Sequence, residues 1–239
     1  DEAVPADKTD TLLFLSPKEV TILANAFKEA GFKPDEVIKQ KDAKKQAKEL
    51  EDIIGKTDHH IDALDIALFG RMVAQAATMN VEAAASFAHA ISPHKVTNEV
   101  EFFTALDDRS EEPGSAHMGS LEFNSATYYR YVSLNVGQLW QTLAGQNIPE
   151  AVECFVKALF VAVPSARQAT QSGASPWEFA RVLVRKGQRL QIPFETAVKP
   201  QDGGFLEPSK KTMREYLEKK EKLAGSLFGK IQSFEFGEN

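Results

Sequence analysis

The chain has 239 residues, enough for one large domain or two small ones, and its apolar fraction of 43% and charged fraction of 26% are those of an ordinary soluble protein. With 28 lysines and arginines against 34 aspartates and glutamates, the formal net charge is −6, which argues mildly against a free-standing nucleic-acid binder. One cysteine, Cys154, excludes an intrachain disulfide, and no apolar run approaches the roughly 20 residues of a transmembrane helix. We therefore expect a cytoplasmic protein that has no membrane among its partners.

The charge is unevenly spread along the chain. Between Arg167 and Lys230 there are 13 lysines and arginines against 7 aspartates and glutamates, so this part carries +6 and the remainder carries −12. Exposed charges interact only within a Debye length of roughly 8 Å at physiological salt, so a basic face can coexist with an acidic total. From charge alone, a solvated mixed-charge surface is an equally good interpretation.

The first predicted elements are helices. The string Ser16–Glu19 places a capping serine, a proline at the first helical position and a glutamate where a capping box needs it, so a helix should begin at Pro17 and end near Gly31. A second helix is predicted from about Pro34 or Asp42 to Ile54, ending at Gly55. Residues 1–10 are polar and show no apolar periodicity, so we expect them to be loose.

Lysines gather on the second predicted helix. Such a stripe is usually a solvated face, and like charges four residues apart are mildly unfavourable in an isolated helix. The functional alternative is a rail that contacts the phosphates of a nucleic acid. The cluster consists of Lys39, Lys41, Lys44, Lys45 and Lys48.

The middle of the chain is less regular. Ile66 to Phe69 is predicted to be a short buried strand, whereas Val81 to Ile91 has alanines that favour a helix and an alternation that favours a strand. Ser92 to Ser125 contains proline, glycine, many charges and only brief apolar clusters. More than thirty residues without clear periodicity indicate a functional or mobile loop.

The last part of the chain mixes strands and helices. This order of elements favours an α+β protein with helices on one face of a sheet. The predicted elements are a strand from Tyr128 to Asn135, a helix from Pro149 to Val163, strands at Phe179–Val184 and Gln191–Phe194, and a last helix from Pro208 to Leu223.

Histidines and aspartates between positions 89 and 117 invite a metal-site interpretation. However, His89 and His94 are five residues apart and would lie on opposite faces of a strand, so ordinary surface or hydrogen-bonding histidines are the default. No phosphate-binding GxxxxGK[ST] loop, GxGxxG string or nucleophile elbow is present. We expect no metal, no cofactor and no enzymatic activity. The alternative that stays open is a metal-dependent ribonuclease using His89, His94, Asp107, Asp108 and His117.

The cluster Phe102–Leu106 is apolar and flanked by acidic residues. Two interpretations are open. The cluster could anchor the loop on the core, or its side chains could wedge between the bases of single-stranded RNA, where stacking is worth about 1–3 kcal/mol per base. An acidic flank disfavours long phosphate contacts but tolerates an apolar wedge.

Three strings together resemble one known family. They are LDIALFGRM (Leu64 to Met72), FAHAISPHKVTNEVEFFTALDD (Phe87 to Asp108) and GSAHMGSLEFNSATYYRY (Gly114 to Tyr131). They are similar to the repeating backbone subunit of the type I-E CRISPR surveillance complex, Cascade. The resemblance implies a noncatalytic scaffold that polymerises head to tail along the guide RNA, with target DNA and other Cascade subunits as further partners.

The same resemblance implies a fold. We expect an RNA-recognition-motif-like (ferredoxin-like) palm, with a helical finger region in residues 1–86, a palm strand in 87–95 that starts from about Ser86, a thumb loop in 96–127, and the remaining palm in 128–239. The family's first strand and a basic, serine-containing segment have no counterpart here. We therefore expect a carboxy-terminal fragment with weak RNA affinity on its own and a poorly ordered thumb from about Thr97 to Ser120.

Site residues follow from the resemblance position by position. Two departures from the family pattern are Glu51 and Gln201, which stand where lysines would be expected. The residues implied to contact guide RNA are Met72, Phe103, Thr104, Leu106 and Lys199, and those implied to contact target DNA are Lys44, Lys45 and Lys48.

Overall fold

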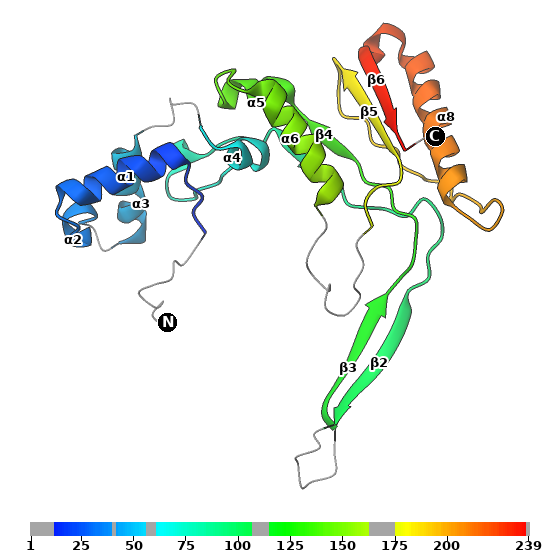
Figure 1. The fold of residues 1–239 in the computed structure, drawn as a ribbon, viewed down its shortest axis with the longest axis horizontal. Coiled ribbons are helices and arrows are strands. Elements are labelled where there is room, and N and C mark those ends of the chain that lie inside the picture. The colour runs from blue at the N-terminus through cyan, green and yellow to red at the C-terminus, as the bar shows by residue number, and fades with distance from the viewer. Residues whose placement is uncertain (1–11, 40–41, 56–60, 107–114, 163–174, 238–239) are drawn as a thin grey trace. The chain divides into compact units, whose positions relative to one another are not determined.

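The computed structural model describes residues 12–39, 42–55, 61–106, 115–162 and 175–237. The chain forms two compact units, one made of Asp1–Ser86 with Val132–Pro176 and the other of Phe87–Tyr131 with Trp177–Asn239. The elements of both units are labelled in Figure 1, and each unit is described by itself.

Three helices open the first unit. α1 (Pro17–Glu29) begins with a complete capping box, in which the Ser16 hydroxyl and the Glu19 carboxylate each accept a backbone N–H of the other residue. α2 (Pro34–Val37) is a single turn, and α3 (Ala43–Ile54) ends at Gly55. The two predicted helix starts, at Pro17 and at either Pro34 or Asp42, are confirmed, because α2 begins at Pro34 and Asp42 is the N-cap of α3.

The predicted strand at Ile66 to Phe69 is wrong, because this segment is a helix, α4 (Leu64–Phe69). Ile66, Ala67 and Leu68 are all buried. A run of only three buried apolar residues is too short to show the helical or the strand period, so its sequence does not decide between them. Gly70 ends α4 at φ +77°, where a Cβ would lie 2.8 Å from the carbonyl oxygen of Val81.

Short strands and two further helices complete the first unit. β1 (Ala85–Phe87) and β4 (Val132–Leu134) form a two-stranded sheet, followed by α5 (Val136–Thr142) and α6 (Ile148–Val161). The predicted helix from Pro149 is confirmed, whereas α5 was not predicted. The strand predicted from about Ser86 overlaps β1 but stops at Phe87, and beyond it only Ile91 forms an isolated bridge, to Tyr129. The core of this part contains Ala67, Leu68, Ala84, Ala85, Leu139, Leu143, Ala151 and Phe155.

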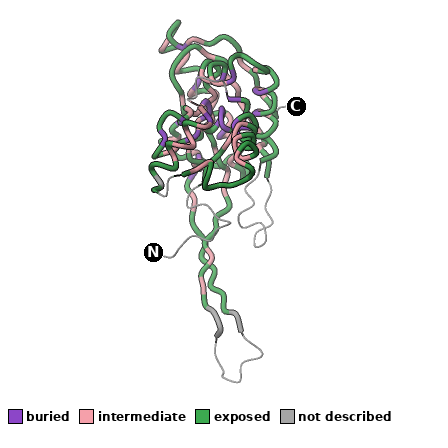
Figure 2. The backbone as a smooth tube through the Cα atoms, turned by 90° about the vertical axis from the view of Figure 1, so that its left-hand side faces the viewer, coloured by how far each residue is buried: buried purple, intermediate pink, exposed green. Residues whose placement is uncertain are grey.

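A long antiparallel hairpin belongs to the second unit. β2 (Glu99–Leu106) pairs with β3 (Ser115–Phe123), so the described part of the segment Ser92 to Ser125, predicted to be an irregular loop, contains two paired strands. Apolar and acidic side chains occur on both faces, so the sequence shows no clear apolar face for this hairpin. In Figure 2 most of the hairpin is coloured as exposed.

The rest of the second unit contains a second antiparallel strand pair and a helix. β5 (Ala180–Arg185) pairs with β6 (Lys230–Phe236), and α8 (Leu206–Ala224) and the short helix η2 (Gly225–Phe228) precede β6. The predicted strand at Gln191–Phe194 is wrong. This segment is irregular because the Tyr129 and Tyr131 hydroxyls, not a strand, accept the backbone N–H groups of Ile192 and Leu190.

The described strands form three two-stranded sheets alongside the helices, which makes the protein α+β as predicted. They do not form the single larger sheet of an RNA-recognition-like palm within the described residues. None of the described helices is both long and apolar enough to cross a bilayer.

Candidate nucleic-acid interface

The hairpin presents the predicted RNA-contact residues on two different faces. Residues opposite each other in an antiparallel pair share a face, and neighbours along a strand alternate. Phe103 pairs with Gly119, whereas Thr104 pairs with Met118 on the other face. The resemblance implies that both Phe103 and Thr104 contact guide RNA, and the structure places these two side chains on opposite faces of the hairpin.

Phe102 and Met118 share the face of Thr104. Phe102 is 81% exposed and Met118 is 73% exposed. Phe102 pairs with Ser120, so Phe102 and Met118 are diagonal neighbours across the hairpin, within reach of one another's side chains. The site residues implied by the resemblance omitted both. The strand alternation around Thr104 would have shown that Phe102 shares its face.

The other face carries Phe103 over Gly119. A Cβ placed on Gly119 would lie 2.7 Å from Cζ of the Phe103 ring and 2.9 Å from its Cε1. The ring is 42% exposed, so one of its sides covers the Gly119 backbone and the remainder faces solvent. A ring seated in this way is pre-organised, because little side-chain freedom is left to lose when a ligand stacks on it.

His94 fastens the base of the hairpin. Its Nε2 accepts the backbone N–H of Thr127 at 3.1 Å, which places the imidazole proton on Nδ1, and Nδ1 donates to the carbonyl of Lys95 at 2.9 Å. The ring also stacks on Phe205, with centroids 3.7 Å apart and planes 13° apart. His94 is buried and hydrogen-bonded, so it holds together the two chain segments from which the hairpin extends.

The loop that carries Lys199 is attached to the same base. The backbone N–H of Val198 donates to the carbonyl of Pro93 at 2.9 Å, and Gln201 and Gly204 exchange two backbone hydrogen bonds of 2.9 Å. Lys199 lies between these anchors and is exposed. Phe103, Thr104 and Lys199 therefore belong to one unit, with the lysine placed beside the hairpin base.

Met72 lies in the first unit. It is 84% exposed, although it directly follows Arg71, which is among the most buried charged residues described. The backbone of Arg71 pairs with that of Val81 through two hydrogen bonds of 3.0 and 2.9 Å. An exposed methionine held by a fixed backbone suits a contact surface better than a core position.

The predicted DNA-contact lysines lie together on α3. Lys44, Lys45 and Lys48 are exposed, while Ile54 on the opposite side of the helix is packed with Ala76 and Met79. The helix therefore has a basic outer face, as expected. Glu51 does not lie free among the lysines, because its carboxylate accepts a hydrogen bond from the Thr78 hydroxyl.

Several sequence-predicted residues lie wholly or partly outside the described part of the structure. The backbone of Leu106 pairs with Ser115, and that of His117 with Ala105, but their side chains are not described. Asp107 and Asp108 are not described at all. Among the described residues there is no group of three or more histidines, cysteines, aspartates or glutamates that could hold a metal ion.

A family model describes almost the whole chain. The model of the CT1975-like proteins (Cas_CT1975) matches residues 2–233. The chain belongs to this family. No curated protein matches the CT1975-like chain.

Solved structures are similar to this CT1975-like protein. A chain from a "CRISPR RNA-guided surveillance complex, pre-nicking" is 26% identical with a TM-score of 0.72, and the match covers 94% of this chain and 62% of that one. A chain from a "CRISPR RNA-guided surveillance complex" is 30% identical with a TM-score of 0.61, covering 72% and 66%. The CT1975-like chain thus spans less than two thirds of the length of the first of these relatives.

Proposed function

We propose that this protein is a noncatalytic, guide-RNA-binding backbone subunit of a CRISPR surveillance complex of the type I-E Cascade kind. The observation that carries the proposal is its structural similarity, over 94% of the chain, to a chain of an RNA-guided surveillance complex. Copies of the subunit would associate head to tail along the guide and contact other subunits of the complex. The two-stranded sheets would be parts of an RNA-recognition-like palm.

The hairpin would act on the guide RNA as a thumb. Its two faces carry exposed apolar side chains, Phe103 on one and Phe102 with Met118, beside Thr104, on the other. An aromatic ring that stacks on a base contributes about 1–3 kcal/mol, independently of base identity. A ribbon with apolar groups on both faces could separate two successive bases and displace a nucleotide between them.

Cations and a thioether would complete the contact with RNA. Lys199, exposed beside the hairpin base, would neutralise a guide phosphate, and Met72 would stack as a second wedge. The outer face of α3, with Lys44, Lys45 and Lys48, would contact the phosphates of target DNA. These contacts are local, so the acidic total of −6 does not oppose them.

Fluorescence anisotropy with a labelled guide-length RNA tests the RNA assignment. We expect Phe103→Ala combined with Lys199→Ala to weaken binding by at least about tenfold, because one stacked base and one phosphate contact are lost. The matched control is Phe234→Ala with Lys211→Ala, which removes a strand phenylalanine of similar exposure and an exposed lysine from the same unit. Equal affinities for the two double variants would refute the assignment.

The absence of catalysis is part of the proposal and has its own test. Labelled RNA incubated with the protein and Mn²⁺ or Mg²⁺ should remain intact. Metal-dependent cleavage that His117→Ala abolishes would instead establish a ribonuclease.

A further inference from the structure

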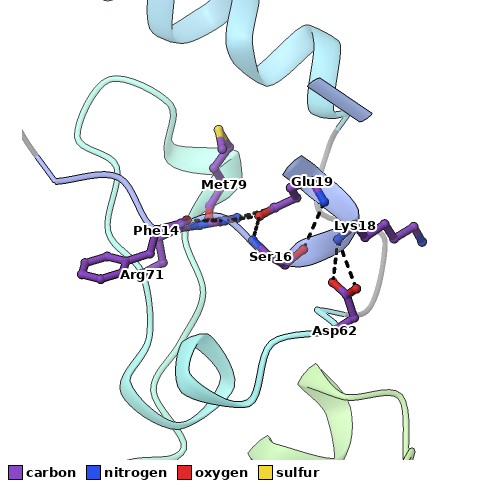
Figure 3. Close-up of polar contacts among 7 residues, drawn as sticks. All are labelled: Phe14, Ser16, Lys18, Glu19, Asp62, Arg71 and Met79. Carbon is purple, nitrogen blue, oxygen red and sulfur yellow. Dashed lines mark hydrogen bonds and ion pairs between the residues drawn. The ribbon is translucent and has the colours of Figure 1, made fainter. Parts of the chain in front are cut away.

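A buried ion pair lies directly behind the exposed Met72. Arg71 Nη1 and Nη2 donate to the two carboxylate oxygens of Glu19 at 2.6 and 2.9 Å, and the two side chains are only 1% and 8% exposed. Figure 3 shows the guanidinium facing Glu19 at the start of α1. This parallel two-bond geometry is the most directional that a charged pair can adopt.

The remaining donors of Arg71 reach two further segments. Nε donates to the carbonyl of Met79 at 2.8 Å, and Nη1 also donates to the carbonyl of Phe14 at 3.0 Å. Glu19 additionally accepts the backbone N–H of Ser16 at 2.7 Å. One guanidinium therefore joins the segment before α1, the first turn of α1 and the loop that follows α4.

Stability alone does not explain such a pair. Desolvating two charges offsets much of their attraction, and well-packed apolar residues often serve a core equally well. The planar guanidinium of Arg71 does, however, donate to four acceptor oxygens at once, and this is possible in only one arrangement of the three segments that carry them. The pair is therefore best understood as a device that sets the position of the backbone around Arg71.

The backbone from Arg71 to Val81 forms a loop that is closed by the two hydrogen bonds between these residues. The two ends of the loop lie in different surroundings. Met72 leaves the loop at its beginning and is exposed. At its end, Met79 is fully buried against α3, and the Thr78 hydroxyl donates to Glu51 of α3. The same loop thus supports the Met72 side chain and the inner face of the lysine-bearing helix.

We propose that Arg71 is a positioning residue. Through its pair with Glu19 it holds the Arg71–Val81 loop, and so fixes the position of Met72 relative to the lysines of α3. The inference rests on the proposed function, in which Met72 meets guide RNA and α3 meets target DNA. Loosening the loop would weaken both contacts together, although Arg71 itself reaches neither nucleic acid.

The full chain carrying Arg71→Met with Glu19→Gln tests the inference. This double variant leaves no unpaired buried charge, and the glutamine preserves an acceptor for the capping box of α1. The matched control is Lys33→Gln with Glu36→Gln, which removes an exposed pair from the same unit without changing net charge. Should the first variant fail to fold, Arg71→Lys, which keeps the charge but not the planar fork, replaces it.

The probes are a guide-length RNA, a DNA duplex and the methyl resonance of Met72. We expect the Arg71 variant to shift and broaden that resonance and to weaken RNA binding about as much as Met72→Ala does, roughly tenfold. Adding Met72→Ala to the Arg71 variant should then lower RNA affinity by less than about a further twofold, because the effects of two residues that act through one contact do not add. Duplex affinity should fall as well, and the control variant should change none of these quantities.

Two results would overturn the inference: an unchanged methyl resonance, or RNA losses from Arg71 and Met72 that simply add. Failure of the proposed function is separable from both. If Met72→Ala alone leaves RNA affinity intact, the wedge assignment fails, whereas the methyl resonance still reports whether Arg71 positions Met72.

Discussion

The ring of Phe103 covers Gly119, its partner across the β2–β3 hairpin, so closely that a Cβ on the glycine would lie 2.7 Å from the ring. An aromatic residue that shields a cross-strand glycine packs against backbone that would otherwise be bare. The consequence is that the orientation of Phe103 depends on position 119 having no side chain.

Gly119→Ala should therefore displace the Phe103 ring. The tip of an aromatic side chain can swing aside, so we expect the hairpin to persist while RNA affinity falls by about 1 kcal/mol, part of the value of a stacked base. Anisotropy with guide-length RNA measures the loss. Gly187→Ala, in the same unit but outside the hairpin, is the control because a Cβ there meets only ordinary contacts of 3.4 Å or more. An equal effect of the two variants would contradict the prediction.

His94→Ala should loosen the base of the hairpin. It removes two hydrogen bonds and a ring stack and leaves the Thr127 N–H without its acceptor, at a cost of about 2 kcal/mol in unfolding free energy. Amide hydrogen exchange should accelerate at Thr127. The exposed His89, changed to alanine, is the control; unchanged protection at Thr127 in the His94 variant would disprove the clamp.

Replacing Lys44, Lys45 and Lys48 with glutamine should weaken binding to a DNA duplex and reduce its salt dependence. Each phosphate contact contributes about 0.9 to the slope of log affinity against log salt concentration, so a loss of about 3 is the upper expectation. The matched triple change of Lys211, Lys219 and Lys222 on α8 should alter the slope less. Equal slopes for the two triple variants would argue against a specific lysine face on α3.

Gln201→Lys should strengthen RNA binding. The residue is exposed in the loop of Lys199, and a lysine there would add a second cation beside the hairpin base. We expect a gain that is clear at low salt and fades as salt rises, because phosphate contacts release counterions. Gln188→Lys, also exposed in the same unit, is the control; a salt-independent gain would indicate another cause.

Glu235 should make the second unit sensitive to acid. Burial alone would raise the pKa of this carboxyl, but the hydrogen bonds and charges of Arg214 and Arg181 outweigh it and hold the pKa below its ordinary value of 4.5. A carboxyl with a lowered folded-state pKa stabilises the fold above its ordinary pKa, and this stabilisation is lost as the pH falls through the folded-state value.

The Tm difference between the wild type and Glu235→Gln should accordingly be largest near neutral pH and narrow below about pH 4.5. Thermal unfolding monitored by circular dichroism across pH 3–7 provides the measurement. Glu195→Gln, at an exposed position, is the control and should show no such trend. A difference that widens in acid would mean that the Arg181 and Arg214 contacts do not stabilise the charged form.

Local signals in the sequence were sufficient for the helices with clear ends. The capping box at Ser16 and Glu19 defined α1, and the strong amphipathic pattern defined α6. Where the signal was only a short apolar run, as at Ile66 to Phe69, strand and helix were indistinguishable and the prediction was wrong. The pairing of β5 with β6 was not predicted, because the paired residues are more than forty positions apart and no local sequence signal indicates which strands pair.

For the candidate site, the sequence by itself determined the similarity to subunits of CRISPR surveillance complexes, the apolar string around Phe103 and the lysine-rich face of α3, since these depend on residue identity and helical spacing. Only the tertiary structure decided that Phe103 covers Gly119, that His94 clamps the hairpin base, and that Arg71 and Glu19 meet across fifty-two residues. The physical reason is that side-chain contacts are set by strand register and by packing between distant segments, which composition and local periodicity do not encode.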